Sequence, residues 1–178
     1  MEFREFKLSD KQEIQRKCAK TGKIHINKEG IKKFLKNLKY PLYYLDFETF
    51  NAAVPMYEGT KPYQQIPFQF SLHVDDEEKV KHFEFLHDSP KDPRERFLLE
   101  LKKVLGSEGC IVVFYQSFEI GWLQELGEAF PEHKEWINDV VKRIVDLAEP
   151  FKNFYYYNPK QKGQYSIKKV LPSLTGNG

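Results

Sequence analysis

The chain has 178 residues, of which 40% are hydrophobic and 30% are charged, so it is long enough to bury one full hydrophobic core. No apolar run approaches the roughly 18 residues that span a bilayer, and the N-terminus carries acids where a secretion signal has an apolar stretch. We therefore expect a cytoplasmic protein without a membrane partner. Only two cysteines occur, and Cys110 lies in an apolar run, which argues against a disulfide framework and favours a buried reduced thiol.

The charge of the chain is distributed unevenly. The net charge of +2 is too small to indicate nucleic-acid binding by itself. Lysines are concentrated before residue 40 and again from Lys152 onward, whereas residues 75–78 are four consecutive acids. Such runs are usually solvated surfaces, so the distribution alone assigns no partner.

The N-terminal part of the chain predicts an extension, a helix and a strand. Residues 1–26 are polar and lysine-rich with weak helical periodicity, so we interpret them as an extension that precedes the folded domain, residues 27–178. Asn27 can cap a short helix with apolar residues at positions 31, 34, 35 and 38. Pro41 ends that helix, and a first strand continues through Thr49.

The next two elements predict a β-hairpin. Residues 66–74 alternate apolar and polar side chains as a half-buried strand does, and residues 80–86 alternate in the same way. The four acids at 75–78 predict the turn between them.

The second half of the chain predicts helices alternating with short strands. Residues 92–95 combine an N-cap, a first-turn proline and a capping-box acid, and so open a helix. The unbroken apolar run at 110–114 predicts a central strand that is covered on both faces. Further segments predict helices at 118–126 and 132–143, a short strand at 144–147 and a helix start at 165–171. The expected fold class is mixed α/β.

Two acids in the first strand are the most informative feature of the sequence. Asp46 and Glu48 are two positions apart, so both project from the same face of a strand. Carboxylate ligands of this kind suit Mg²⁺ or Mn²⁺, and a cation between them would offset their mutual repulsion. The alternative is a strand that runs out into solvent, with both acids hydrated at its tip.

The order of elements, with Asp-x-Glu on the first strand, resembles the ribonuclease H-like fold of the DnaQ-like, or DEDD, 3′–5′ exonucleases. The runs at 44–50, 62–73 and 165–172 are similar to an uncharacterised bacterial domain of unknown function that is regarded as DnaQ-like. That family often lies C-terminal to RecB-like or Cas4-like nuclease regions. Over residues 27–174 the resemblance implies a mixed sheet, antiparallel in its first three strands and then parallel, flanked by helices.

The resemblance also implies a catalytic site. Residues 116–119 match the family's second motif, with Glu119 standing where an aspartate is usual. Asp46, Glu48 and Glu119 are therefore the expected catalytic residues and metal ligands. They would hold two Mg²⁺ or Mn²⁺ ions and hydrolyse phosphodiester bonds of single-stranded DNA or RNA.

Three further residues lie near the expected ligands. Phe47 and Phe118 are each adjacent to a ligand in the sequence, and we expect them to pack beneath the site. Asp146 lies near the end of the short strand predicted at 144–147, where related folds often carry an acid. It can equally cap the loop before Pro150, so it is a weaker candidate ligand.

One acid of the superfamily has no counterpart in this chain. It normally lies on a helix beyond the position of residues 165–171, but residues 175–178 contain no acid. We expect the chain to be a fragment truncated at its C-terminus. The alternative is that the last ligand comes from elsewhere. The missing acid also supports a second function, a degenerate nuclease-fold module that binds nucleic acid or supports a neighbouring nuclease domain. A phosphohydrolase acting on small nucleotides is a third possibility.

A short polar segment after the first strand suggests nucleotide contacts. Tyr63, Gln64 and Gln65 follow the acid pair closely and, with Gln116, could bind a nucleotide. A plain loop that enters a strand is the alternative.

The lysine-rich C-terminal segment suggests a platform for a single strand. Residues 152–169 interleave tyrosines with lysines, so Tyr165 could stack on a base while Lys168 contacts a phosphate. The alternative is a tyrosine-rich strand and loop that covers the core.

Overall fold

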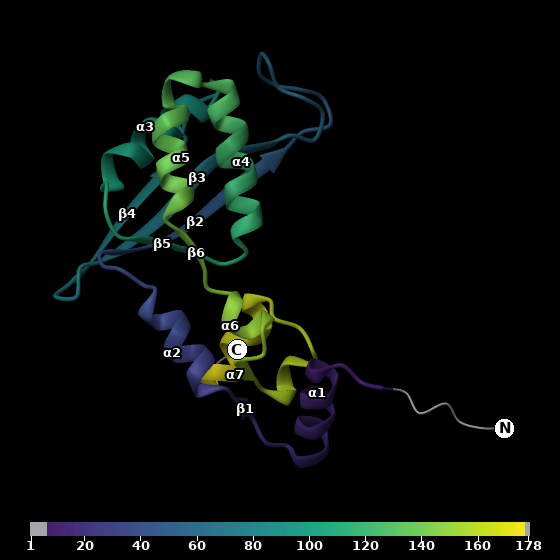
Figure 1. Cartoon of the computed structure of the whole chain (residues 1–178). Helices are drawn as coiled ribbons and strands as arrows, with labels where there is room; N and C mark the ends of the chain where they lie inside the picture. The colour runs from purple at the N-terminus through teal and green to yellow at the C-terminus, as the bar shows by residue number, and fades with distance from the viewer. Residues whose placement is uncertain (1–6, 177–178) are drawn as a thin grey trace. The chain divides into compact units, whose positions relative to one another are not determined.

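The computed structural model describes residues 7–176, and its contacts divide the chain into two compact units (Figure 1). Unit 1 comprises the described residues up to Asn37 and from Ala148 onward, and unit 2 comprises Leu38–Leu147. The boundary that the sequence predicts at residue 26 stays a prediction, and residues 1–6 and 177–178 lie outside the described residues. None of the helices formed by residues 7–176 is both long and apolar enough to cross a membrane.

Unit 2 contains a five-stranded mixed sheet in the order β4-β3-β2-β5-β6. The first three strands pair antiparallel, whereas β5 and β6 run parallel to β2. The predicted α/β class and mixed sheet are thus confirmed. The strands are β2 (Leu42–Asn51), β3 (Gln65–Asp75), β4 (Val80–Leu86), β5 (Cys110–Val113) and β6 (Ile144–Asp146).

Three helices cover one face of this sheet (Figure 1). They are α3 (Arg94–Val104), α4 (Gln116–Ala129) and α5 (Lys134–Lys142), the last preceded by the 3₁₀ turn η1 (Pro131–His133). Their apolar residues meet alternate residues of the strands, because side chains on a strand alternate between its faces. Phe97 of α3 lies at the centre of this core, fully buried and in contact with the rings of Phe47, Phe70 and Trp122.

The opposite face of β2, β3 and β4 carries exposed polar side chains. Tyr44, Asp46 and Glu48 of β2 alternate with three buried residues of the same strand. His73 of β3 stacks on His82 of β4, with ring centroids 4.3 Å apart. This face is therefore polar on its antiparallel half, whereas every residue of β5 is buried, as the sequence predicts.

Unit 1 is built from short elements. An antiparallel pair of two-residue strands joins its N-terminal and C-terminal segments. Helix α1 begins with a capping box formed by Ser9 and Gln12, and Asn27 caps α2 as predicted. The elements are α1 (Asp10–Thr21), β1 (His25–Ile26), α2 (Lys28–Lys36), α6 (Glu149–Lys152), β7 (Tyr156–Tyr157), η2 (Pro159–Gln161) and α7 (Ile167–Thr175).

Candidate functional site

The acid pair lies in the middle of β2, on its exposed face. The burial of β2 alternates residue by residue, which confirms that Asp46 and Glu48 project from the same side of the strand. Asp46 is paired with Ser71 and Glu48 with Gln69, so neither acid is at the tip of the strand. Both carboxylates are exposed beside a sheet whose other face forms the core.

A β-bulge follows Glu48 directly. Glu48 pairs with Gln69 but Thr49 pairs with Pro67, so Phe68 is an extra residue in β3. Bulges bend a strand and redirect its side chains, and they occur often beside active sites. Here the bulge marks the end of the stretch that presents the two acids.

Glu119 lies in the first turn of α4 and is almost completely buried. Its Oε2 atom has no hydrogen-bond partner among the residues that the structure describes. Burial raises the pKa of Glu119 to about 7; the backbone N–H of Glu119 opposes this rise, and the negative charges of Asp46 and Asp146 add to it. The fold thus brings Glu119 into the electrostatic field of Asp46, which is 73 positions earlier in the chain.

Asp146 holds the turn between β5 and α4. Its Oδ1 atom accepts a hydrogen bond from the backbone N–H of Tyr115 at 3.0 Å. Tyr115 has a positive φ of 74° and immediately precedes α4. By fixing this left-handed residue, Asp146 positions the first turn of α4 and therefore Glu119. Its predicted role as a cap before Pro150 stays a prediction.

No preformed metal cluster is present in residues 7–176. Among these residues, no three histidine, cysteine, aspartate or glutamate side chains lie close enough together to hold a metal ion. The structure relates Asp46 to Glu119 through charge, but it does not gather Asp46, Glu48 and Glu119 into one ligand set.

The two phenylalanines next to the predicted ligands have different surroundings. Phe47 is buried, and its ring meets Trp122 edge-on with centroids 4.4 Å apart, which confirms the predicted packing role. The same prediction for Phe118 is wrong, because its side chain is 44% exposed. Helix α4 begins at Gln116, and the helical period from that start turns Glu119 inward and Phe118 outward. Gln116 itself is exposed.

In the predicted nucleotide-contact segment, residues 63–65, the two glutamine side chains form hydrogen bonds within the protein. Gln65 accepts a hydrogen bond from the Thr49 hydroxyl at 2.7 Å, and Gln64 donates to Glu125 at 3.1 Å. Tyr63 differs, because it has a positive φ of 59° and its side chain is 69% exposed. Of the three residues, only Tyr63 presents an exposed side chain.

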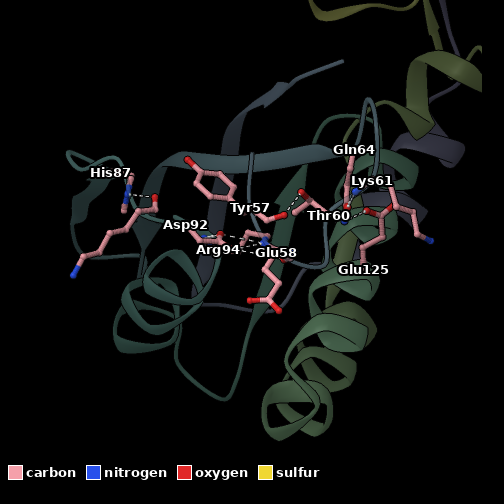
Figure 2. A network of polar contacts seen from close by, with 10 residues as sticks. Tyr57, Glu58, Thr60, Lys61, Gln64, His87, Asp92, Arg94 and Glu125 are labelled. Carbon is pink, nitrogen blue, oxygen red and sulfur yellow. Dashed lines mark hydrogen bonds and ion pairs between the residues drawn. The ribbon is translucent and has the colours of Figure 1, made fainter. Parts of the chain in front are cut away.

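Arg94 is a buried residue that the sequence pattern did not single out. Its guanidinium pairs with Asp92 at 2.6 Å and donates to the Glu58 carbonyl (Figure 2). The guanidinium also lies over the Phe130 ring. These contacts attach the loop between β2 and β3 to the start of α3. A hollow of about 460 Å³ lies beside this loop, lined in part by Tyr63, Arg94 and Glu125. Asp46, Glu48 and Glu119 do not line it.

The predicted single-strand platform belongs to unit 1. Tyr157 is buried and stacks on Phe154 with centroids 4.7 Å apart, and the Tyr156 hydroxyl donates to the Ser173 carbonyl. These tyrosines pack within unit 1, as the alternative interpretation expects. Tyr165 is half-buried before α7, and Lys168 is exposed on α7.

Comparisons with known proteins identify relatives but no solved structure. The chain is 31% identical to "Uncharacterized protein UU173" of Ureaplasma parvum serovar 3 over 167 residues, which cover 87% of this chain and 24% of the relative. It is 30% identical to "Uncharacterized protein MG366 homolog" of Mycoplasma pneumoniae over 177 residues, covering 86% of this chain and 27% of the relative. The chain thus spans only 24% and 27% of the lengths of these two relatives. No solved structure matches it.

A family model matches most of unit 2 and continues into unit 1. The match covers residues 43–166, which include both acids of β2, Glu119 and Asp146. The description of that family is "Domain of unknown function (DUF2779)". Because the match extends over more than half of the sequence, this chain belongs to the DUF2779 family.

Proposed function

We propose that the chain is part of a metal-dependent 3′–5′ exonuclease that hydrolyses single-stranded DNA or RNA. The strand order supports this proposal, because the sheet has the first predicted strand at its centre, antiparallel partners on one side and parallel partners on the other. This arrangement is the one that the resemblance to the ribonuclease H-like fold leads us to expect. In the longer relatives, a RecB-like or Cas4-like nuclease region would be the expected neighbour.

The observation that carries the proposal is the buried carboxyl group of Glu119. A buried acid with an unpartnered oxygen is costly, and the nearby negative charges of Asp46 and Asp146 increase that cost. Proteins usually keep such groups where the group has a function. A cation in this position would remove the repulsion and give Glu119 Oε2 a partner.

The residues fit a divalent cation in donor type. Asp46, Glu48 and Glu119 would hold it, because all three offer the carboxylate oxygens that Mg²⁺ and Mn²⁺ prefer. When bound, a pair of such ions supplies an activated water and a counter-charge for the leaving 3′ oxygen. The chain's own part is electrostatic: below a pH of about 7, Glu119 holds a proton and reduces the negative charge around Asp46.

A second candidate function is a nuclease-fold module that binds nucleic acid without cutting it. The observation that favours it is that no three potential ligands converge in residues 7–176. Such a module would bind nucleic acid, or support a neighbouring nuclease domain, in the longer protein.

Manganese binding measured together with strand cleavage tests the proposal. We expect calorimetry to detect Mn²⁺ binding to the chain, and a 5′-labelled single strand to be shortened stepwise from its 3′ end. The double variant Asp46→Ala, Glu48→Ala should lose both activities, because it removes two of the three donors. Glu84→Ala is the matched control, since Glu84 is an exposed acid of the same sheet with no assigned role.

The possible results separate the two candidates. Binding and cleavage that survive in Glu84→Ala but not in the double variant would support the exonuclease. A chain that binds a labelled single strand but neither Mn²⁺ nor Mg²⁺ would exclude the exonuclease and favour the binding module.

A further inference from the structure

We propose that the outward face of α2, formed by Lys28, Lys32, Lys33 and Lys36, binds the phosphate backbone of nucleic acid. This lysine face of α2 adds a binding surface to the proposed nuclease. The inference stands on charge and geometry in unit 1 and needs none of the carboxylates of unit 2.

The two units carry opposite net charges. The described residues of unit 1, 7–37 and 148–176, hold fifteen lysines and arginines against four acids, a net charge of +11. Unit 2 holds twelve against twenty, a net charge of −8. The small net charge of the whole chain hides this difference. A compact unit of about 60 residues with such an excess of cations attracts polyanions over long range.

The lysines of α2 form a row that is as long as a short stretch of phosphate backbone. Each helical residue turns by about 100° and rises 1.5 Å, so Lys28, Lys32 and Lys36 lie on one side of α2 over about 12 Å. Phosphates of one strand of a duplex follow each other every 3.4 Å along the axis, so the row spans about three to four of them. The opposite side of α2 carries Phe34, which is buried.

Most of these cations are not neutralised within the chain. Lys32 forms an exposed ion pair with Glu29 at 3.5 Å, and Lys28, Lys33 and Lys36 form no ion pair with any described residue. Lys32, Lys33 and Lys36 also line an open hollow of about 310 Å³ together with Glu29. An exposed ion pair is worth little, so Lys32 is also available to a phosphate.

Base stacking cannot contribute much to this surface. No aromatic side chain in the described part of unit 1 is fully exposed. Tyr155 illustrates the reason, because its ring packs directly over Gly30 of α2. The lysine face should therefore bind phosphates through charge alone, with little preference for base sequence.

Nucleic acid fits this face better than a protein or a membrane does. Lysine is depleted in the centres of protein interfaces, because its strongly hydrated ammonium group is costly to desolvate. A helix that lies in a membrane needs a free apolar face, but Phe34 of α2 is already buried. Leu35 is exposed only at the margin of the lysine face.

Fluorescence anisotropy with a labelled 20-nucleotide strand in EDTA tests the inference on the whole chain. We expect the quadruple variant K28Q/K32Q/K33Q/K36Q to bind about a hundredfold or more weakly at 0.1 M salt, because each lost contact with a single strand costs about fivefold. The slope of log K against log salt should fall by about 3. An abasic strand of equal length should bind the unmodified chain within a few fold of the normal strand.

Two matched variants test whether the loss of binding depends on the position and on the charge of the removed lysines. K79Q/K81Q/K91Q/K142Q removes the same charge from exposed lysines of unit 2 and should change binding less than about threefold. The corresponding four-fold lysine-to-arginine variant of α2 should keep binding, because the charge remains. Equal losses in the two glutamine variants would overturn the inference, as would binding of the chain to phosphatidylserine vesicles but not to the strand. EDTA excludes the metal, so a failed nuclease assay would leave this result unaffected.

Discussion

Units 1 and 2 are stabilised in different ways. Unit 2 has one apolar cluster of seventeen buried residues, contributed by the sheet and three helices. In the described part of unit 1 the corresponding cluster contains three buried residues, Cys18, Phe154 and Tyr157. Much of unit 1 is instead fixed by polar contacts, such as those from Asn158 to Gln161 and to the Ser173 carbonyl.

This difference teaches that average composition can conceal two kinds of unit in one chain. Apolar burial gives about 25 cal/mol per Å², so the large core of unit 2 can tolerate the repulsion of its clustered acids. Unit 1 has a small core and a large excess of cations, whose mutual repulsion opposes its folding. We therefore expect unit 1 to be the less stable unit, and an anion bound to it to stabilise it.

The largest expected effect comes from opening the core of unit 2. Phe97→Ala removes a fully buried ring that contacts four other rings, so it should cost about 3–5 kcal/mol in the free energy of unfolding. Native-state hydrogen exchange would locate the loss in the amides of β2 and β3. Leu99→Ala, on the exposed side of the same helix, is the control and should change little. Equal loss of protection in α1 and α2 would contradict the comparison, because it would mean that both units unfold together.

A second effect depends on the charge of Glu119. Its pKa is about 7 in the folded chain and 4.5 is the ordinary value, so unfolding releases a proton between these pH values. Stability should therefore fall as the pH rises from about 5 to 7, by up to about 3 kcal/mol. Glu119→Gln should remove this fall and be the more stable protein at pH 8. Urea unfolding in EDTA at several pH values measures the free energy of unfolding of both proteins. If that free energy had the same pH dependence in both, Glu119 would titrate normally.

The smallest effects distinguish two helical glycines, one in each unit. A Cβ atom on Gly30 of α2 would lie 2.6 Å from the Tyr155 ring, so Gly30→Ala should destabilise unit 1 by about 1–3 kcal/mol. A Cβ atom on Gly121 of α4 would meet nothing within 4 Å, so Gly121→Ala should stabilise unit 2 by about 0.5–1 kcal/mol. Hydrogen exchange of the amides of α2 and of α4 measures the stability changes of unit 1 and unit 2 separately. A Gly30→Ala variant that is as stable as the unmodified chain, or more stable, would refute the packing of Tyr155 on α2.

Local patterns predicted the elements of unit 2 well. Alternation placed Asp46 and Glu48 on the same face of their strand, and it gave the bounds of β4. The Asn27 cap was also predictable, because a side chain that accepts the Gly30 N–H needs only neighbours in the sequence. Such features depend on residues a few positions apart.

Features that depend on distant residues were not predictable from local patterns. The start of α4 was placed two residues late, because Tyr115 is fixed by Asp146 from another strand. The exposure of Phe118 was missed as well. The tyrosines at 155–157 suggested a platform, but their packing depends on the N-terminal helices of unit 1. The burial of Arg94 likewise depends on a carbonyl in the loop after β2.

The bulge opposite Thr49 has a consequence for how the sheet assembles. Pro67 directly precedes the extra residue Phe68 and is paired with Thr49. As a proline, it has no N–H to donate to a neighbouring strand. If β3 slid by one residue against β2, each side-chain pair across the two strands would be mismatched. The proline and the bulge thus help to fix the register of β3 against β2. They select one pairing when the strands first meet during folding, and that pairing is the one that sets the two acids beside polar partners.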